Sequence, residues 1–470
     1  MSKKFVVLAI VLLNLLIVGY ILLPGMEGGG PWSWKKSAPV KPKIYQQLSS
    51  KLWSKTKRGG GLMEDMKQCS LATEMTTREL SELQPVVDKV QAFFEVLQTI
   101  FPTEFLEELN NPCWYSNFNL QKSIRRTLIT HLKQHTSLHE AQIIDLSSNI
   151  TEESETNNLF CLPYFFVPGF AKCGSTSLHS TLKQHPQILP PATKEPQWWT
   201  RSPLRDMNVD LLKLVSLRYP LYFAPAAKEI SAHPSDKLIT YDAAQSYLWD
   251  SNFLSKINNL DYCATPALFS RILPNAKFIV IMRNPITRAL SDFYMMCSMN
   301  PQQRRPPEMH TDPAGRFHAV ALKDMTTFNN CLMTTGHSLP WCLGELHSHP
   351  QGCGYIGRRL LIGLYYVHIH KWMQFYPREN FLFLRTEDML QEPHQLMTRI
   401  TEFLGIDPVS EDQAKEWLSK VSNARHWHPS VDPAKLVMRQ ETVKLLEDFF
   451  GPYNAKLAEL AGDERFLWKD

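Results

Sequence analysis

The fold of this chain is decided by the stretch Tyr164-Phe165-Phe166-Val167-Pro168-Gly169-Phe170-Ala171-Lys172-Cys173-Gly174-Ser175-Thr176-Ser177-Leu178. It is typical of a short buried strand, a tight turn and the first turn of a helix. A helix that begins in this way presents backbone N–H groups and the positive end of its dipole to an anion. The stretch therefore predicts a phosphate-binding loop. Its expected ligand groups are Lys172, Cys173, Gly174, Ser175, Thr176 and Ser177.

The position of the lysine in this loop argues against ATP chemistry. The ATP-binding loop of kinases and NTPases carries lysine directly before the Ser or Thr. In this chain Gly174 occupies that place and Lys172 comes two residues earlier. A nucleotide-dependent kinase is therefore the disfavoured alternative.

A second segment predicts another phosphate contact. The run Phe278-Ile279-Val280-Ile281-Met282 is a buried strand that ends at Arg283, and a helical pattern follows. Open α/β sheets bind ligands at the carboxyl ends of their strands. Ser291 lies eight residues after Arg283, about two helical turns further on, so the two side chains could hold one phosphate together.

The order of segments predicts an α/β fold with a central parallel sheet flanked by helices, similar to P-loop proteins. Apolar runs at 164–167, 278–282 and 381–384 each precede a turn and a helical stretch. Residues 63–139 carry a mostly helical pattern. We expect a stem and helical region over 24–110 and the main domain over 111–470, with its core from about 157.

Composition limits the partners. The chain has 470 residues, with 50 basic and 46 acidic side chains and a net charge of +4. That balance does not favour nucleic acid as a partner, so any anion must be held by a local site. His-x-His occurs three times without a spaced third ligand, and we expect no metal site.

The N-terminus predicts a membrane anchor. Residues 5–23 are apolar apart from Asn14 and Tyr20, a length that can cross a bilayer. Lys3 and Lys4 precede this run, which favours a cytoplasmic tail at 1–4 and a lumenal domain; a cleaved signal peptide is the alternative.

Two further features agree with a lumenal location. Asn149 begins an Asn-Ile-Thr glycosylation acceptor. Four of the nine cysteines flank expected loops in pairs, and an oxidising compartment lets such pairs close. The pairs are Cys113 with Cys161 and Cys331 with Cys342.

Taken together, the two phosphate segments resemble those of sulfotransferases that use 3′-phosphoadenosine 5′-phosphosulfate (PAPS). The resemblance extends through 194–201, 363–378 and 385–388. Further back, 111–115 and the ending 466–469 are most similar to the Golgi N-acetylgalactosamine 4-sulfate 6-O-sulfotransferase branch. This resemblance implies a type II Golgi enzyme that transfers a sulfo group to chondroitin or dermatan sulfate, at C6 of the 4-sulfated sugar. Another glycan or position, a homodimer, and a silent glycan-binding scaffold are left open.

The resemblance also implies roles for individual residues. Glu195 stands where related glycan sulfotransferases carry their catalytic glutamate, and Lys172 meets the charge on the leaving phosphate. Arg283, Ser291 and, in a late loop, Arg425 are expected at the nucleotide. Acceptor contacts are expected from Lys194, Trp198, Trp199, Arg201 and Asp242, although core packing of the tryptophans is the plainer alternative.

The chain departs from the branch pattern at one place in the expected acceptor site. Tyr241-Asp242-Ala243-Ala244 stands where a Gly-Glu-Ala-Ser-like stretch is expected. Asp242 is one carbon shorter than glutamate, which bears on acceptor specificity more than on the chemistry. Arg205 and Arg288 are further candidates for the anionic glycan, with ordinary surface charge as the alternative.

Overall fold

The computed structural model describes residues 62–72, 75–82, 84–116, 158–201, 218–250, 263–298, 311–345, 358–419 and 438–469. Within these ranges no helix is both long enough and apolar enough to cross a bilayer. The expected anchor at 5–23 lies outside them, so it stays a prediction.

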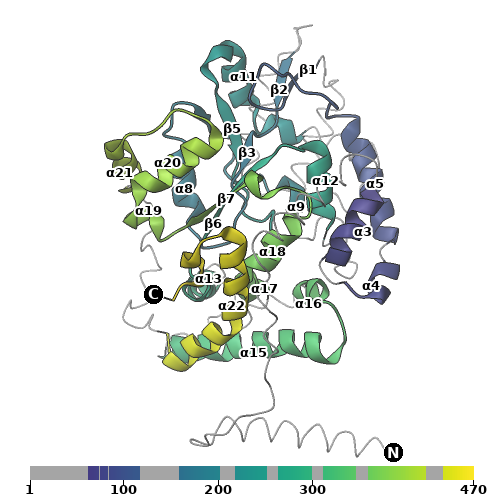
Figure 1. Ribbon diagram of the computed structural model, residues 1–470, viewed down its shortest axis with the longest axis vertical. Helices are drawn as coiled ribbons and strands as arrows, with labels where there is room; N and C mark the ends of the chain where they lie inside the picture. The colour runs from purple at the N-terminus through teal and green to yellow at the C-terminus, as the bar shows by residue number, and fades with distance from the viewer. Residues whose placement is uncertain are drawn as a thin grey trace, which may run out of the picture. The chain divides into compact units, whose positions relative to one another are not determined.

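The described chain is built around a parallel sheet of five strands in the order β4-β5-β3-β6-β7 (Figure 1). The strands are β3 (Phe165–Phe166), β4 (Ile188–Leu189), β5 (Ile239–Asp242), β6 (Lys277–Met282) and β7 (Phe381–Arg385). Every pairing in this sheet is parallel. The predicted central parallel sheet is confirmed, and its predicted strands are β3, β6 and β7.

Both faces of the sheet are covered, which explains why β6 and β7 are largely continuous apolar runs rather than alternating ones. On β6, Phe278 and Val280 pack into one core cluster while Ile279 and Ile281 pack into another. Figure 1 shows α8 and α20 on one side of the strands and α9 and α12 on the other. The sheet is therefore the middle layer of three.

Helices pack on both faces of the sheet. On the face of Ile279 lie α8 (Ser175–Leu182), α20 (Pro393–Leu404) and α21 (Glu411–Ser419). On the face of Phe278 lie α9 (Trp198–Arg201), α12 (Ala264–Ile272) and α18 (Tyr365–Trp372). Further helices are α11 (Ala224–Ala232), α17 (Arg358–Leu361) and α19 (Asp388–Gln391).

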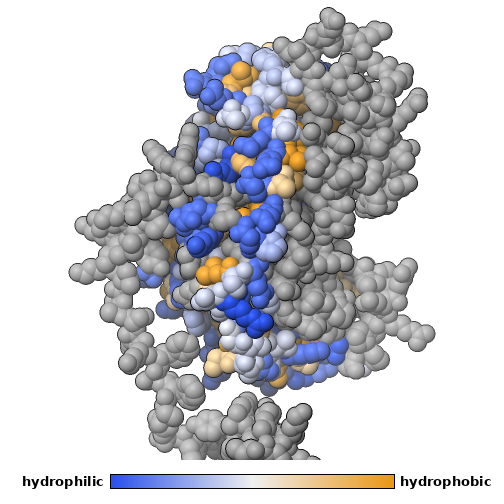
Figure 2. Space-filling model, turned by 90° about the vertical axis from the view of Figure 1, so that its right-hand side faces the viewer, coloured by the Kyte–Doolittle hydropathy of each residue, from blue (hydrophilic) through white to orange (hydrophobic). Residues whose placement is uncertain are grey.

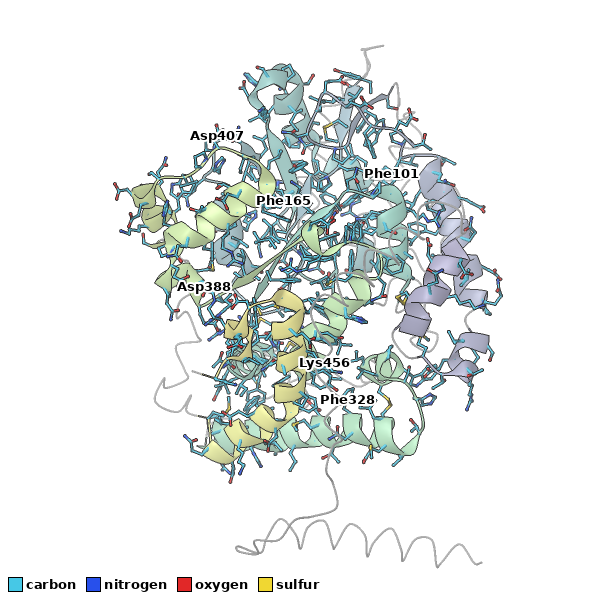
Figure 3. The ribbon with its side chains drawn as sticks, viewed as in Figure 1. Phe101, Phe165, Phe328, Asp388, Asp407 and Lys456 are labelled. Atoms are coloured by element: carbon cyan, nitrogen blue, oxygen red, sulfur yellow. A yellow bond between two sulfur atoms is a disulfide. The ribbon has the colours of Figure 1, made fainter. Side chains whose placement is uncertain are left out.

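A third apolar cluster is formed by helices beyond the carboxyl end of β6. They are α13 (Pro285–Ser298), α15 (Pro313–Thr334), α16 (Leu339–Glu345) and α22 (Gln440–Ala461). Figure 3 labels one residue from each of these three clusters: Phe101 and Phe165 from the two faces of the sheet, and Phe328 on α15.

The N-terminal helices pack on the sheet domain. They are α3 (Leu62–Ala72), α4 (Thr77–Ser81) and α5 (Gln84–Gln98), so the helical prediction holds for these ranges. Val87, Val90, Phe93 and Leu97 follow a three- and four-residue spacing and join the cluster on the Phe278 face. The view in Figure 2 is toward the side on which α3–α5 lie, and most of the coloured surface there is hydrophilic.

The cysteine pairs expected from the sequence are joined in the structure. Cys113–Cys161 and Cys331–Cys342 are disulfides, and a third bond, Cys69–Cys263, links α3 to the start of α12. Cys113–Ser116 is a strand, β1, that pairs with β2 (Asn158–Cys161) in an antiparallel ladder. The expected helical pattern is therefore wrong at 113–116, where an aromatic pair favours a strand.

Candidate active site

The loop between β3 and α8 has the backbone form of an anion-binding turn. Lys172 and Gly174 both adopt left-handed conformations, with φ of 71° and 83°. A Cβ at position 174 would lie 3.1 Å from Cγ2 of Thr386, so glycine is required there for two reasons. Gly174 caps α8 without a side-chain hydrogen bond, which leaves the first-turn N–H groups of α8 available to an anion.

The predicted second segment lies next to this loop because β3 and β6 are neighbours in the sheet. Thr386, which follows β7, donates its hydroxyl to the carbonyl oxygens of Cys173 and Met282, at 2.6 and 3.0 Å. Tyr365 Oη donates to the Arg283 carbonyl at 2.8 Å and lies 3.5 Å from Cys173 Sγ. The two phosphate segments thus form one cradle.

Positive charge gathers in this cradle. Burial lowers the pKa of Lys172. The negative charge of Asp292 raises this pKa and so partly offsets the effect, whereas the positive charges of Arg283 and Arg359 lower it further. Lys172 and Arg283 therefore share one electrostatic environment, and an anion bound between them would relieve their repulsion. Arg283 Nε donates to Thr287 Oγ1 at 3.1 Å.

The hydroxyl groups expected at the nucleotide differ in their surroundings. Ser175, Ser177 and Ser291 are largely buried, the first two at the start of α8 and the third two turns into α13. Thr176 Oγ1 accepts a hydrogen bond from Lys194 Nζ at 3.0 Å. Burial raises the pKa of the Cys173 thiol to about 11, so it stays protonated and acts as a packed residue rather than a nucleophile.

Glu195 lies within reach of this loop and is surrounded by hydrogen-bond donors. Lys194 Nζ bridges Thr176 Oγ1 and Glu195 Oε1. The other carboxylate oxygen, Oε2, accepts from Gln197 Nε2 at 3.3 Å and from Gln245 Nε2 at 3.4 Å. About a fifth of the Glu195 side chain is exposed, so a substrate can reach it.

Three residues predicted to meet the acceptor are buried instead. Trp198 and Trp199 are 2% and 0% exposed and pack edge to face on each other in the core. Asp242 is fully buried, where burial raises its pKa to about 7. All three side chains are enclosed by protein, and both tryptophans belong to the core cluster on the Phe278 face, as the plainer alternative expected.

Arg288 is also placed differently from the expectation. Its side chain is fully buried, forms an ion pair with Asp292 at 3.0 Å and donates to the Arg359 carbonyl at 2.6 Å. A buried guanidinium that is bonded to these protein groups is not accessible to a glycan. The Arg201 side chain, Arg205, Arg425 and Asn149 lie outside the described residues.

Several residues that build the site have no assigned role from the sequence. Thr386 and Tyr365 lie in stretches that carry the family resemblance, but their bonds to the two phosphate segments are visible only in three dimensions. Glu387 Oε1 accepts from the Asn284 backbone N–H at 2.9 Å. Gln245 carries no sequence signal at all. Among the described residues no cluster of His, Cys, Asp and Glu could hold a metal ion.

A parallel sheet that ends in two segments suited to phosphate groups, with a carboxylate linked to one of them by a lysine, is the arrangement expected of a nucleotide-dependent group-transfer enzyme. The family model for the sulfotransferase domain matches residues 162–425. Mouse and human carbohydrate sulfotransferase 15 are each 30% identical to this chain over 421 and 422 residues, which covers 84% of this chain and 71% of each relative. A solved sulfotransferase from Alicyclobacillus acidocaldarius is 19% identical, covers 66% of this chain and 99% of its own, and has a TM-score of 0.39.

The chain belongs to the sulfotransferase family, among the carbohydrate sulfotransferases, and is a PAPS-dependent enzyme. This confirms the resemblance found in the sequence. The residues present fit the donor: the open N-terminus of α8, the glycine at 174 and two cations suit a nucleotide with two separate phosphate groups.

Proposed function

We propose that this enzyme transfers a sulfo group from PAPS to a glycosaminoglycan, at C6 of N-acetylgalactosamine 4-sulfate in chondroitin or dermatan sulfate. The observation that carries the proposal is the bridge formed by Lys194, whose ammonium contacts both Thr176 of the phosphate loop and Glu195. This bridge holds a carboxylate beside the loop that would receive the sulfo end of the donor. Similarity to carbohydrate sulfotransferase 15 supports a carbohydrate as the acceptor, and the choice of sugar and position follows from the resemblance of the sequence.

In the proposed reaction the sugar hydroxyl gives its proton to Glu195 while its oxygen attacks sulfur. The bond between sulfur and the 5′-phosphate oxygen breaks, and 3′-phosphoadenosine 5′-phosphate (PAP) leaves with the electron pair. Lys172 and the N–H groups of α8 stabilise the charge that develops on the leaving phosphate. Arg283 and Ser291 hold the 3′-phosphate, and Arg425 is a further proposed contact.

The cellular setting of the proposed function is the Golgi lumen. We propose a type II arrangement with the anchor at 5–23 and glycosylation at Asn149, supported by the apolar run and the acceptor sequence. The disulfides Cys69–Cys263, Cys113–Cys161 and Cys331–Cys342 are compatible with an oxidising compartment.

The test is transfer of labelled sulfo groups from PAPS to chondroitin, dermatan, heparan and keratan chains, followed by disaccharide analysis. We expect a 4,6-disulfated product from chondroitin and dermatan. Lys172→Ala should lower kcat about 10²–10³-fold through loss of charge stabilisation. Glu195→Gln should lower it about 10²–10⁴-fold through loss of the base.

Matched controls come from the exposed ion pair between Lys415 and Glu411 on α21. Lys415→Ala and Glu411→Gln remove the same charges far from the cradle in sequence and should leave kcat unchanged. Transfer that persists in both active-site variants would remove the assigned roles. Absence of transfer to every glycan, with PAP still bound, would favour a silent scaffold.

A further inference from the structure

Gln245 stands out in the segment that leads away from β5. In the described stretch 239–250 all residues except Gln245 are buried, and Gln245 is partly exposed. The segment occupies the place where the sequence departs from its branch, directly after Asp242. A single solvent-facing amide in a buried segment suggests a role at the site rather than in the core.

Asp242 fixes the backbone before Gln245. Its Oδ1 accepts the backbone N–H of Ala244 at 2.9 Å. Its Oδ2 accepts hydroxyl hydrogen bonds from Tyr219 at 2.9 Å and from Tyr247 at 2.7 Å. All the hydrogen-bonding groups of this network are buried, where such bonds are strong and geometrically restrictive.

Ser246 fixes the backbone after Gln245. Its hydroxyl shares a hydrogen bond of 2.6 Å with Thr200, and both groups are buried. Thr200 lies on α9, which follows Glu195 in the chain by a short turn. The turn that carries Gln245 and the turn that carries Glu195 are therefore tied to each other.

With the backbone held on both sides, the side-chain amide of Gln245 points toward the carboxylate of Glu195. Gln245 Nε2 donates to Glu195 Oε2 at 3.4 Å, while Lys194 contacts the other oxygen. Gln197 Nε2 donates to the same oxygen as Gln245, at 3.3 Å. A carboxylate with donors on both oxygens cannot rotate freely, so its orientation is fixed. Preorganisation of this kind is a large part of general-base catalysis.

We propose that Gln245 is a positioning residue for sulfuryl transfer, whose amide orients Glu195 and whose own place is set by the Asp242 network. This inference rests on the proposed function, because it assigns Glu195 as the base. It predicts an effect on the chemical step and none on nucleotide binding.

The experiment compares Gln245→Ala and Gln245→Glu in the full chain, with PAPS and chondroitin sulfate. Removing the amide should lower kcat about 10-fold, the usual effect of one hydrogen bond to a charged group. The isosteric Gln245→Glu places a carboxylate against Glu195 and should lower kcat further than alanine does. The Kd for PAP and the acceptor KM should stay within about twofold of the wild-type values.

The matched control is Gln84, whose amide donates to Asp88 at 2.7 Å on the exposed side of α5. Gln84→Glu makes the same chemical change there and should leave kcat unaffected. Equal kcat values for wild type and Gln245→Ala, equal losses in the Ala and Glu variants, or a change confined to the acceptor KM would each overturn the inference. Because these comparisons need an active wild-type enzyme, a wild type without transfer refutes the proposed function instead.

Discussion

Two hydroxyl groups hold the phosphate segments in register. The side chain of Thr386 joins the carbonyls of Cys173 and Met282, and that of Tyr365 joins the Arg283 carbonyl to the Cys173 sulfur. Hydrogen bonds to buried carbonyls have a modest net value, but leaving a buried carbonyl without one costs about 1–3 kcal/mol. These two side chains therefore hold the two segments of the cradle in place relative to each other.

Tyr365→Phe tests this coupling. The variant leaves the Arg283 carbonyl without its donor, so the 3′-phosphate segment should shift and PAP should bind several-fold more weakly. Isothermal titration with PAP measures the change. Tyr376→Phe is the control, because Tyr376 is also buried and its hydroxyl donates to the Leu273 carbonyl at 2.9 Å. Both variants should lose similar stability, and equal losses of PAP affinity would contradict the assignment.

Asp242 makes a pH-dependent contribution to stability. Burial raises its folded pKa to about 7 from 3.8, with Glu195 raising it further and the hydroxyls of Tyr219 and Tyr247 lowering it. Between these two values the native state keeps a proton that the unfolded state has lost. The stabilising contribution therefore falls as the pH rises from about 4 to 7 and is lowest above 7.

Asp242→Asn removes this dependence and keeps the shape of the side chain. Relative to wild type, the variant should be more stable at pH 8 than at pH 5, by on the order of a few kcal/mol. Urea unfolding of both proteins at the two pH values measures the difference. A stability difference that does not change with pH would show that Asp242 is ionised throughout the range.

At the scale of elements, the sequence indicates strands β3, β6 and β7 but not β4 and β5. Strands β6 and β7 are predicted because apolar runs of five and four residues, at 278–282 and 381–384, each precede a turn. The two-residue β4 is too short to show a pattern, and β5 contains Thr240 and Asp242, whose burial depends on tertiary partners. Trp198 and Trp199 show the same limit, since an aromatic pair suits a sugar site and a core equally well.

For the candidate site, the sequence predicts the groups that backbone chemistry dictates and does not indicate those that depend on contacts between distant segments. Gly174 and Lys172 follow from the requirements of a strand–turn–helix phosphate loop. Gln245 lies 50 residues from its partner Glu195, and nothing local marks it. Hydrogen bonds between distant segments follow from the packing of whole elements, which a single sequence does not specify in detail.

Gly174→Ala tests the loop that joins β3 to α8. A methyl group there meets Thr386 Cγ2 at 3.1 Å on a backbone with φ of 83°. The left-handed conformation alone should cost about 1–2 kcal/mol, and the contact should also displace the loop and weaken PAP binding by 10-fold or more. Gly405→Ala is the control, because Gly405 has φ of 70° at the end of α20 with no atom within 4 Å of the added group. Loss of PAP affinity in both variants would show that backbone strain, rather than the contact at the site, is responsible.

At the scale of the whole chain, the described N-terminal helices belong to the catalytic unit. Val90, Phe93 and Leu97 of α5 are at most 2% exposed and share one cluster with the core on the Phe278 face of the sheet. The Cys69–Cys263 disulfide and the ion pair of Asp65 with Arg271 at 2.5 Å fasten α3 to α12. Burial of each large apolar side chain contributes about 1.5–3 kcal/mol, an amount comparable in sum to the stability of an ordinary domain.

This packing predicts where the chain can be shortened. A secreted fragment that begins at residue 62 keeps α3–α5 and should be soluble, monodisperse and able to bind PAP. A fragment that begins at residue 111, the boundary expected from the sequence, lacks α3–α5. It therefore exposes the core surface that α5 covers and leaves Cys263 unpaired, so it should aggregate. Size-exclusion chromatography and PAP titration of both fragments measure the outcome.

The double variant Cys69→Ser with Cys263→Ser in the longer fragment separates the loss of the disulfide from the loss of the apolar contacts. Its free energy of unfolding should be lower by about 2–5 kcal/mol, yet it should stay soluble because the apolar contacts remain. A soluble fragment from residue 111 that binds PAP as the longer one does would show that the sheet domain is stable without α3–α5.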